Sequence, residues 1–276
     1  MNNILVTGSK GQLGSELQEL INQYSYNFFF TNRKTLDITN SKQVNQFIEN
    51  NQIDVILNCA AYTSVDLAEE NKKVANLVNH LAVKNLAKIT KEKQIKLIHI
   101  STDYIFNGEN FKPYSEIDPA MPKNTYGETK LNGENAIKAI NPKHTIIIRT
   151  SWVYSSFGNN FVKTMLSLGK KQKDLKIIFD QVGTPTYAKD LAITILNIIP
   201  QLKNNNVEVY HYSNEGVVSW YDFAKKIMEI ENINCHISPI ETSEYFTVAQ
   251  RPYYSVLNKN KKKKHLIFKF LIGKIV

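Results

Sequence analysis

The stretch Ile4-Leu5-Val6-Thr7-Gly8-Ser9-Lys10-Gly11-Gln12-Leu13-Gly14 decides the fold, because it joins an apolar strand directly to a helix through three glycines. A turn built from residues without a Cβ atom lets a pyrophosphate approach the backbone N–H groups at the helix N-terminus. The G-x-x-G-x-x-G spacing differs from the G-x-G-x-x-G pattern of NAD dehydrogenases, so its place between strand and helix is what favours a dinucleotide. We therefore predict that Gly8, Gly11 and Gly14 contact a cofactor. The alternative is a glycine turn that binds nothing.

Apolar, β-rich runs alternate with segments of helical spacing along the chain. The strand candidates are residues 4–7, 28–31, 55–59, 97–101, 145–149 and 176–179, and the helix candidates are 12–24, 41–51, 65–94, 124–140 and 219–231. Continuous apolar strands alternating with helices indicate a parallel sheet covered on both faces. The sequence therefore predicts an α/β fold, a doubly wound parallel sheet of the Rossmann type, with a smaller C-terminal substrate-binding lobe.

The alternation loosens after about residue 150, where Gly, Pro and aromatic residues are scattered. We predict an NAD(P)-binding Rossmann domain in residues 1–150, a mainly substrate-binding lobe in 151–258 with some strands returning to the main sheet, and an atypical basic and apolar tail in 259–276. No run of about 18 apolar residues and no leader-like N-terminus is present, so we expect a cytoplasmic protein without a membrane partner. Cys59 and Cys235 are too few for a disulfide framework or a metal cluster and are expected to be free thiols.

The net charge of +9 is concentrated at one end of the chain. Residues 251–276 hold eight Lys or Arg and no Asp or Glu, so the remainder is nearly neutral. A groove that binds nucleic acid attracts phosphates through clustered cations, and the main body lacks such an excess. We predict no nucleic-acid partner. Binding by the lysine tail is a separate hypothesis, which requires a salt-dependent affinity that disappears when residues 258–276 are deleted.

Basic residues follow the second strand candidate, in Thr31-Asn32-Arg33-Lys34. No acidic residue stands there to hold a ribose 2′-hydroxyl, whereas Arg33, with Lys10, could bind a 2′-phosphate. This favours NADPH, with NADH as the second choice, although cations in such a loop are often only solvated. Asp37 and Ile38 come next and are predicted to flank an adenine ring.

The chemistry is predicted from Tyr126 and Lys130, which are four residues apart and project from one face of a helix. A free phenol ionises near pH ~10, and a neighbouring ammonium stabilises the phenolate and lowers the phenol's pKa. Thr102 ends a strand, where such sheets place ligands, and can donate a second hydrogen bond to a carbonyl oxygen. The alternative is an amphipathic helix with a half-buried tyrosine and a solvated lysine. The three residues together predict proton delivery during carbonyl reduction.

Five further strings occur in order along the chain: Asn58-Cys59-Ala60-Ala61-Tyr62-Thr63-Ser64-Val65-Asp66-Leu67-Ala68-Glu69, Ser101-Thr102-Asp103-Tyr104-Ile105-Phe106-Asn107-Gly108, Arg149-Thr150-Ser151-Trp152-Val153-Tyr154, Asp180-Gln181-Val182-Gly183-Thr184-Pro185-Thr186 and Arg251-Pro252. With the glycine turn they resemble the extended short-chain dehydrogenase/reductase superfamily, and within it the dTDP-4-dehydrorhamnose reductases, over roughly residues 1–258. The resemblance implies reduction of the C4 keto group of dTDP-4-dehydro-β-L-rhamnose to dTDP-L-rhamnose, a cell-surface polysaccharide precursor, by NAD(P)H.

The resemblance also implies roles for single residues. Thr102, Tyr126 and Lys130 match the catalytic trio, and Thr102, Asp103 and Trp152 would meet the sugar nucleotide. The residues that would line the cofactor are Gly11, Gln12, Leu13, Asp37, Ile38, Ala60, Ala61 and Tyr62. An indole is a suitable wall for a deoxysugar or a thymine, with ordinary core packing as the alternative for Trp152. Arg251 could pair with the diphosphate or form a surface salt bridge.

Two features depart from that pattern. Members of the family usually end in a Trp-Arg-Glu-like stretch that packs a final helix, whereas this chain continues from Lys261 through four lysines into apolar residues. A frame slip in an adenine-rich gene would produce such a tail; resequencing that finds the frame intact would refute this hypothesis. Some members also dimerise around Mg²⁺, but this chain has no acidic residue after Glu244. Glu16 is the remaining candidate ligand, with a solvated helix carboxylate as the favoured alternative. The chain is expected to be a monomer or a homodimer.

Two other classes of function stay open at this point. A nucleotide-sugar epimerase or dehydratase of the same superfamily would oxidise and restore its cofactor within one cycle. Dehydratases generally carry acidic residues after the strand-end Thr, and here only Asp103 follows Thr102 directly. A non-catalytic NADP-binding regulatory subunit would bind the cofactor without turnover, because a fold does not imply an activity.

Overall fold

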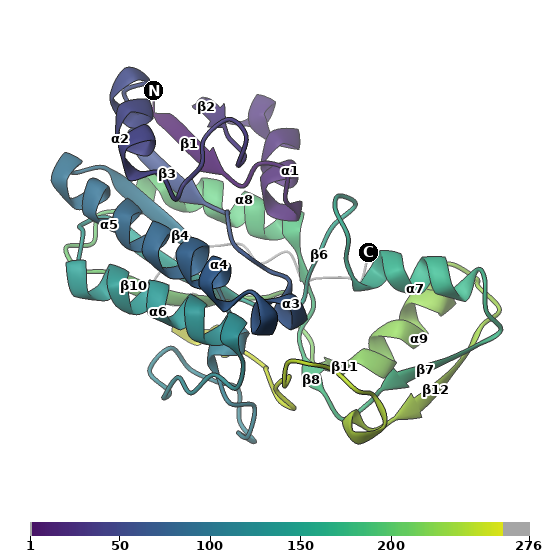
Figure 1. Ribbon diagram of the computed structural model, residues 1–276. Helices are drawn as coiled ribbons and strands as arrows, with labels where there is room; N and C mark the ends of the chain where they lie inside the picture. The colour runs from purple at the N-terminus through teal and green to yellow at the C-terminus, as the bar shows by residue number, and fades with distance from the viewer. Residues whose placement is uncertain (1, 262–276) are drawn as a thin grey trace.

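The computed structural model describes residues 2–261, and its centre is a sheet of six parallel strands (Figure 1). The strands are β1 (Asn3–Thr7), β2 (Asn27–Phe30), β3 (Val55–Asn58), β4 (Lys96–Thr102), β5 (Thr145–Thr150) and β10 (Glu208–Tyr212), in the order β10-β5-β4-β3-β1-β2. The chain winds outward from β1 to β2 and then in the opposite direction from β3 onward. The predicted doubly wound parallel fold is confirmed, and its switch point lies between β1 and β3.

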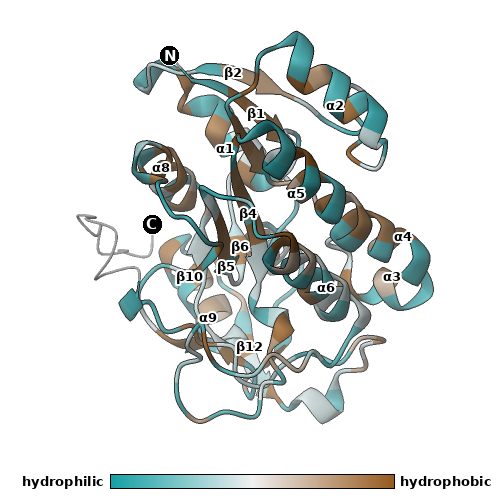
Figure 2. Cartoon of the chain, turned by 90° about the vertical axis from the view of Figure 1, so that its left-hand side faces the viewer, coloured by the Kyte–Doolittle hydropathy of each residue, from teal (hydrophilic) through white to brown (hydrophobic). Residues whose placement is uncertain are grey.

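Helices cover both faces of this sheet, with α1 (Gln12–Glu19) and α8 (Ala188–Ile198) on one face and α2 (Ser41–Asn50), α5 (Ala82–Lys93) and α6 (Thr125–Ile140) on the other. Ile4 and Val6 belong to the apolar cluster on the α1 side, whereas Leu5 between them belongs to the α5 side. Successive side chains of a strand point to opposite faces, so a continuous apolar run fills both layers. In Figure 2 the central strands are mostly hydrophobic, and the helices around them alternate between hydrophobic and hydrophilic residues.

A smaller lobe lies beside the sheet and has its own apolar cluster. It contains α7 (Phe161–Gly169), β7 (Asp174–Ile178), β8 (Val182–Gly183), β11 (Val218–Ser219), α9 (Trp220–Ile230) and β12 (His236–Ile240). The strand predicted at 176–179 is β7 and pairs with β12 rather than with the main sheet. The sixth strand of the main sheet is instead β10, which was not predicted. It is a sheet edge whose sequence, Glu-Val-Tyr-His-Tyr, contains two polar residues and is not a continuous apolar run.

Two predicted helices are shorter or more broken than expected. The segment 12–24 ends as α1 at Glu19 and continues as a 3₁₀ turn. The segment 65–94 is divided into α3 (Val65–Glu70), α4 (Lys72–Asn76), the π-helical turn η2 (Leu77–Leu81) and α5. Asn71 interrupts the first part, because its amide bonds the Leu67 carbonyl and its backbone leaves the helical region.

No helix within residues 2–261 is both long and apolar enough to span a membrane. Cys59 and Cys235 are free thiols, as predicted. The basic tail begins against the main domain, where Lys261 donates to the Val209 carbonyl at 2.9 Å and lies 4.5 Å from the centre of the Tyr210 ring. The rest of the tail, and with it the frame-slip and nucleic-acid hypotheses, lies outside the described residues.

Candidate active site

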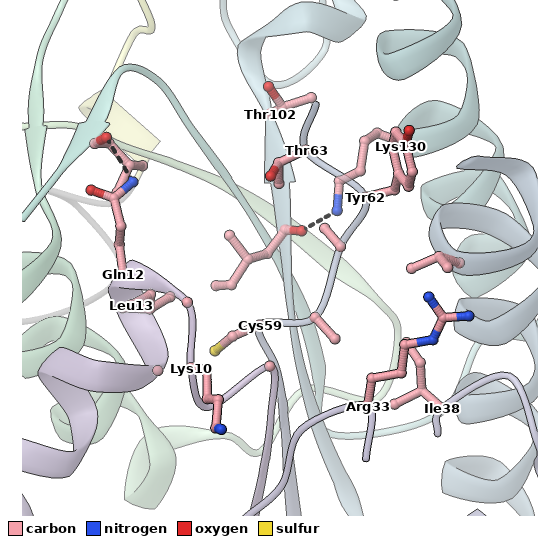
Figure 3. A pocket seen from close by; sticks show the side chains of 18 of the residues that line it. Lys10, Gln12, Leu13, Arg33, Ile38, Cys59, Tyr62, Thr63, Thr102 and Lys130 are labelled. Carbon is pink, nitrogen blue, oxygen red and sulfur yellow. Dashed lines mark hydrogen bonds between the residues drawn. The ribbon is translucent and has the colours of Figure 1, made fainter. Parts of the chain in front are cut away.

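A cavity of about 960 Å³ lies at the carboxyl ends of β1, β3 and β4, beside the switch point. Every predicted site residue except Arg251 lines it, and Figure 3 labels several of them, among them Gln12, Thr102 and Lys130. These residues are Gly8, Gly11, Gln12, Leu13, Gly14, Arg33, Asp37, Ile38, Ala60, Ala61, Tyr62, Thr102, Asp103, Tyr126, Lys130 and Trp152. Segments up to about 140 residues apart in the sequence therefore meet at one place, where open α/β sheets bind ligands.

The glycine turn is shaped by close backbone approaches. Gly8 has φ +67°, and a Cβ atom there would lie 2.7 Å from the Ala60 nitrogen; a Cβ on Gly14 would lie 2.6 Å from the Ser9 Cα. Gly11 is the N-cap of α1 and makes no side-chain cap. The first N–H groups of any helix have no intrahelical partner, and those of α1 also have no capping side chain. They border the cavity, which is the arrangement that binds phosphate groups.

The far end of the cavity is basic. Lys10, Arg33 and Lys34 line it, and Figure 3 shows Lys10 and Arg33 at the opposite end of the view from Thr102. The Asp37 carboxylate is already engaged, because it accepts from the backbone N–H (2.9 Å) and the hydroxyl (2.8 Å) of Thr39. That backbone hydrogen bond is the main reason that the pKa of Asp37 is lowered. This end therefore presents cations next to an apolar residue, Ile38, and the charge of one of them, Arg33, also lowers the pKa of Asp37.

The opposite end brings together the three predicted catalytic residues. Thr102 is the last residue of β4, and α6 begins after Asn124, whose side chain caps the helix by accepting from the Gly127 N–H at 2.8 Å. A Cβ on Gly127 would lie 2.2 Å from the Tyr104 carbonyl oxygen, so glycine lets the start of the helix pack on the loop after β4. Tyr126 therefore stands beside Thr102, close enough for the Thr102 hydroxyl to act on the pKa of the phenol.

The electrostatics of this trio differ from the expectation. Burial raises the pKa of Tyr126 to about 12, against the effect of the Thr102 hydrogen bond, and Lys130 is not among the groups that act on it. The expected lowering of the phenol pKa by Lys130 is therefore wrong for the protein by itself. The Lys130 ammonium instead donates to the Ile100 carbonyl at 2.5 Å. Burial lowers the pKa of Lys130 to about 8, with Glu134 and Cys59 acting in the opposite direction.

Asp103 lines the cavity and has one side-chain oxygen without a hydrogen-bond partner in the described residues. Its side chain is 2% exposed; Oδ1 accepts from Thr102 at 3.1 Å, whereas Oδ2 has no hydrogen-bond partner in the part of the chain that the structure describes. Burial raises the pKa of Asp103 to about 6, whereas the neighbouring Ser255 and Thr102 side chains lower it. A buried polar atom without a partner is costly, so Oδ2 is the oxygen of Asp103 that can accept a further hydrogen bond.

Trp152 links the main domain to the lobe. Its backbone is in the left-handed region, with φ +48°. Its indole stacks on Trp220 of α9, with ring centroids 3.4 Å apart and planes 5° from parallel, and Gly183 leaves room for it because a Cβ there would lie 2.6 Å from the indole. Trp152 thus packs in the lobe core on one side and lines the cavity on the other.

Sequence reasoning missed the loop that holds the glycine turn. Asn160 donates to Gln12 Oε1 at 2.9 Å, Gln12 donates to the Val153 carbonyl at 3.2 Å, and Ser155 donates to Glu16 Oε1 at 2.6 Å. About 140 residues separate the two partners of each of these hydrogen bonds, and no local sequence pattern indicates contacts between residues so far apart.

The candidate metal ligand Glu16 is a buried residue. Its side chain is 2% exposed, so its interpretation as a solvated carboxylate is wrong. Residues 2–261 contain no group of three or more His, Cys, Asp or Glu placed to hold a metal ion.

Asn79 was also missed, and it holds the loop that carries Tyr62. Its side chain accepts from the Tyr62 N–H at 2.8 Å and donates to the Tyr62 carbonyl at 3.0 Å, while its amide also reaches Thr129 on α6. Asn79 lies in the π-helical turn η2, and such turns often occur at functional sites. The break in the predicted helix therefore turns a buried amide toward the cavity wall.

Arg251 is absent from the cavity lining and lies in an ion pair. It donates to both carboxylate oxygens of Asp66, at 3.1 and 2.6 Å, and this pair joins the C-terminal segment to α3. The hydrogen bond to Asp66 raises the pKa of Arg251 against the effect of burial. A contact between Arg251 and a diphosphate stays a prediction that would require this pair to open.

Known proteins match nearly the whole chain. A family model described as RmlD substrate binding domain matches residues 1–271. The spore coat polysaccharide biosynthesis protein SpsK of Bacillus subtilis (strain 168) is 40% identical over 258 residues, which are 94% of this chain and 89% of that protein. The dTDP-4-dehydrorhamnose reductase of Aggregatibacter actinomycetemcomitans is 38% identical over 272 residues, which are 95% of this chain and 92% of that one.

A solved structure supports the same relationship. The dTDP-4-dehydrorhamnose reductase of Bacillus anthracis str. Ames, in complex with NADP, aligns with a TM-score of 0.92 and 38% identity, covering 98% of this chain and 95% of that one. The structural similarity therefore extends over both the main domain and the smaller lobe.

Proposed function

This chain belongs to the RmlD substrate binding domain family, and we propose that it is an oxidoreductase that uses NADPH to reduce the C4 keto group of dTDP-4-dehydro-β-L-rhamnose to dTDP-L-rhamnose. The observation that carries the proposal is the meeting of Thr102, Tyr126 and Lys130 with the glycine turn in one cavity. A relative and a structural neighbour whose alignments cover more than nine-tenths of this chain are dTDP-4-dehydrorhamnose reductases. The NADP held by that neighbour supports the choice of cofactor.

The lining residues fit a dinucleotide. The open N-terminus of α1 would hold the pyrophosphate, Arg33 with Lys10 the 2′-phosphate, and Ile38 one side of the adenine. The Ala60-Ala61-Tyr62 loop, held by Asn79, would lie along the nicotinamide half. When bound, NADPH supplies a hydride to the C4 carbon of the keto sugar.

The protein's own part in the reaction is to bind and protonate the carbonyl oxygen. Thr102 polarises that oxygen through its hydroxyl, and Tyr126 donates its proton to the alkoxide as it forms. Burial raises the pKa of Tyr126 to about 12, so the phenol is protonated at neutral pH and can act as the proton donor. Lys130 would bond the ribose next to the nicotinamide and supply positive charge beside the phenolate that remains.

The sugar nucleotide would be held by the residues around this centre. Asp103 Oδ2 would bind a sugar hydroxyl, because that interaction removes its unsatisfied state. The indole of Trp152 offers an apolar wall to the sugar or the thymine. Mg²⁺ is not part of the proposal, since the buried Glu16 is already engaged with Ser155.

The decisive experiment follows NADPH absorbance while the keto-sugar substrate is generated in situ. We expect one NADPH consumed for each dTDP-L-rhamnose formed. An epimerase or dehydratase would form product without net NADPH consumption, and a regulatory subunit would bind NADPH without oxidising it with any 4-ketosugar nucleotide. Either result would refute the reductase.

Cofactor preference is predicted to depend on Arg33. Arg33→Ala removes charge-assisted hydrogen bonds to the 2′-phosphate, each worth about 1.5–3 kcal/mol. We expect NADPH to bind roughly tenfold to a hundredfold more weakly, with the affinity for NADH unchanged, as measured by titration calorimetry with both cofactors. Lys42→Ala is the control, because Lys42 is exposed and does not line the cavity. Equal losses for the two cofactors would contradict the assignment.

Ligand binding is predicted to change the intrinsic fluorescence. The chain has two tryptophans, Trp152 and Trp220, and they stack on each other, so their emission reports on one place. Adding thymidine diphosphate should change that emission with a saturable dependence on concentration. Trp152→Phe should remove most of the response, whereas Tyr126→Phe should preserve it. A full response in Trp152→Phe would show that Trp152 does not contact the nucleotide.

A further inference from the structure

A row of buried polar side chains crosses the central sheet beneath the cavity. Thr7 of β1 pairs in register with Asn58 of β3, and Asn58 pairs with His99 of β4. All three side chains are at most 1% exposed. Strands of a parallel sheet buried on both faces are usually apolar throughout, so three adjacent polar residues at one level require an explanation. The reaction proposed above uses none of them directly.

The hydrogen bonds along this row determine which nitrogen of His99 carries its proton. Thr7 Oγ1 is 2.7 Å from Asn58 Oδ1, and its other contact, the Ala60 N–H at 3.3 Å, is itself a donor. The Thr7 hydroxyl therefore donates to Asn58 Oδ1, which turns the Asn58 amide N–H toward His99 Nδ1, 2.9 Å away. Since Nδ1 accepts, neutral His99 carries its proton on Nε2.

That Nε2–H group points at Lys130. The distance from His99 Nε2 to Lys130 Nζ is 3.5 Å, longer than a well-formed hydrogen bond. An ammonium group has donors and no acceptor, so it cannot accept from Nε2–H, whereas a neutral amine can. Burial keeps His99 neutral by lowering its pKa well below the usual value, and the Lys130 charge acts in the same direction.

Few other titratable groups act on this pair. Glu134 of α6 and Cys59, just after β3, act on Lys130, and Glu134 also acts on His99. The Glu134 carboxylate is bound by Arg149 at 2.8 Å, and the pKa of the Cys59 thiol is raised by burial to about 12, which keeps the thiol uncharged. Lys130 and Tyr126 lie one turn apart on α6 and line the same cavity. Lys130, with a pKa of about 8, is a stronger acid than the phenol of Tyr126, with a pKa of about 12.

We propose that His99 is a positioning residue for Lys130, because its Nε2–H stabilises the neutral amine that remains when Lys130 reprotonates the phenolate of Tyr126. In that step an N–H bond of the ammonium breaks and the O–H bond of the phenol forms. The Lys130 lone pair then accepts from His99, and solvent later returns the proton to Lys130. The Thr7–Asn58 pair holds His99 in the tautomer that this requires. The inference rests on the reductase proposed above and adds a residue to its proton supply.

The test replaces the donor and measures the acid strength of Lys130. His99→Phe keeps a planar ring but removes the N–H, so the neutral amine loses its partner and the pKa of Lys130 should rise. One neutral hydrogen bond corresponds to roughly half a unit to one unit. The basic limb of the kcat pH profile should move up by that amount. His99→Gln can still present an N–H to Lys130. In this variant the pKa of Lys130 should stay within a few tenths of a unit of its value in the unchanged protein.

Two further arms keep the result interpretable. Asn58→Leu/His99→Phe removes the amide that the single variant leaves unpaired, and it should show the same upward shift if His99→Phe folds poorly. An NMR titration of ¹³C-labelled lysine, with Lys130→Arg to assign the signal, gives the Lys130 pKa without turnover. If the unchanged protein shows no reductase activity, the proposed function is refuted, and the NMR titration still tests the role of His99. An unchanged or lowered Lys130 pKa in the Phe variants would overturn the role of His99.

Discussion

Tyr126→Phe is expected to lower kcat at least about a hundredfold, the low end of what general acid catalysis contributes. The substitution removes the hydroxyl that protonates the alkoxide and preserves the ring, which packs edge to face against Tyr104 with centroids 5.6 Å apart. The affinity for NADPH should therefore stay nearly intact. Stopped-flow measurement of NADPH oxidation, with calorimetry for binding, separates the two effects.

A matched control comes from the neighbouring tyrosine. Tyr104→Phe also removes one hydroxyl at the cavity wall, but Tyr104 is given no part in proton transfer. Its kcat should fall far less than that of Tyr126→Phe. Activity retained by Tyr126→Phe, or an equal loss in both variants, would rule out Tyr126 as the proton donor.

Glu134→Gln is expected to lower the free energy of unfolding by about 3–5 kcal/mol, because it leaves a buried guanidinium without its counter-charge. Glu134 is fully buried and accepts from Arg149 Nη2 at 2.8 Å, from Arg149 Nε at 3.0 Å and from Ser101 Oγ at 2.6 Å. These contacts join α6 to β4 and β5 directly below the catalytic end of the cavity. Denaturant unfolding followed by circular dichroism measures the loss.

Two comparisons identify the cause. Glu229→Gln breaks the exposed pair with Lys226 and should cost less than about 1 kcal/mol. Glu134→Leu/Arg149→Met removes both buried charges and should cost less than Glu134→Gln alone, since no unpaired charge remains. A double variant less stable than the single one would contradict this explanation.

The buried pair of Glu134 and Arg149 also predicts how the stability of the fold depends on pH. Burial alone would raise the pKa of Glu134, but the charge and hydrogen bonds of Arg149 lower it to about 2. A carboxyl whose folded pKa is below its unfolded value, near 4.5, contributes stability that is present above pH ~4.5 and is lost as the pH falls toward 2. The parent should therefore lose more stability than Glu134→Gln over that range.

Much of the site was predictable because its signals are local. Gly8 and Gly14 permit backbone approaches that a Cβ would block, and the Tyr126–Lys130 spacing places two side chains on one helix face. Thr102 ends a strand, and parallel strands present their carboxyl ends at the same edge. Each inference needs only neighbouring residues and a known element type, which explains why these residues line one cavity as predicted.

Other parts could not be predicted because their partners are distant in sequence. Asn160 reaches Gln12, Arg251 reaches Asp66, and Asn79 holds Tyr62 from within a helix that looked regular. The burial of Glu16 and the raised pKa of Tyr126 follow from what surrounds each group in space. Desolvation depends on the folded environment, so a sequence pattern does not reveal it.

The sequence by itself determined the parallel α/β architecture, and it predicted that the glycine turn and the trio of Thr102, Tyr126 and Lys130 would meet at one place, because strand and helix periodicity and glycine spacing act over a few residues. The tertiary structure alone decided the row from Thr7 through Asn58 and His99 to Lys130, and the division of 65–94 around Asn79. Register between strands brings such groups together. The protonation state of a buried side chain is set by the neighbours that this register selects.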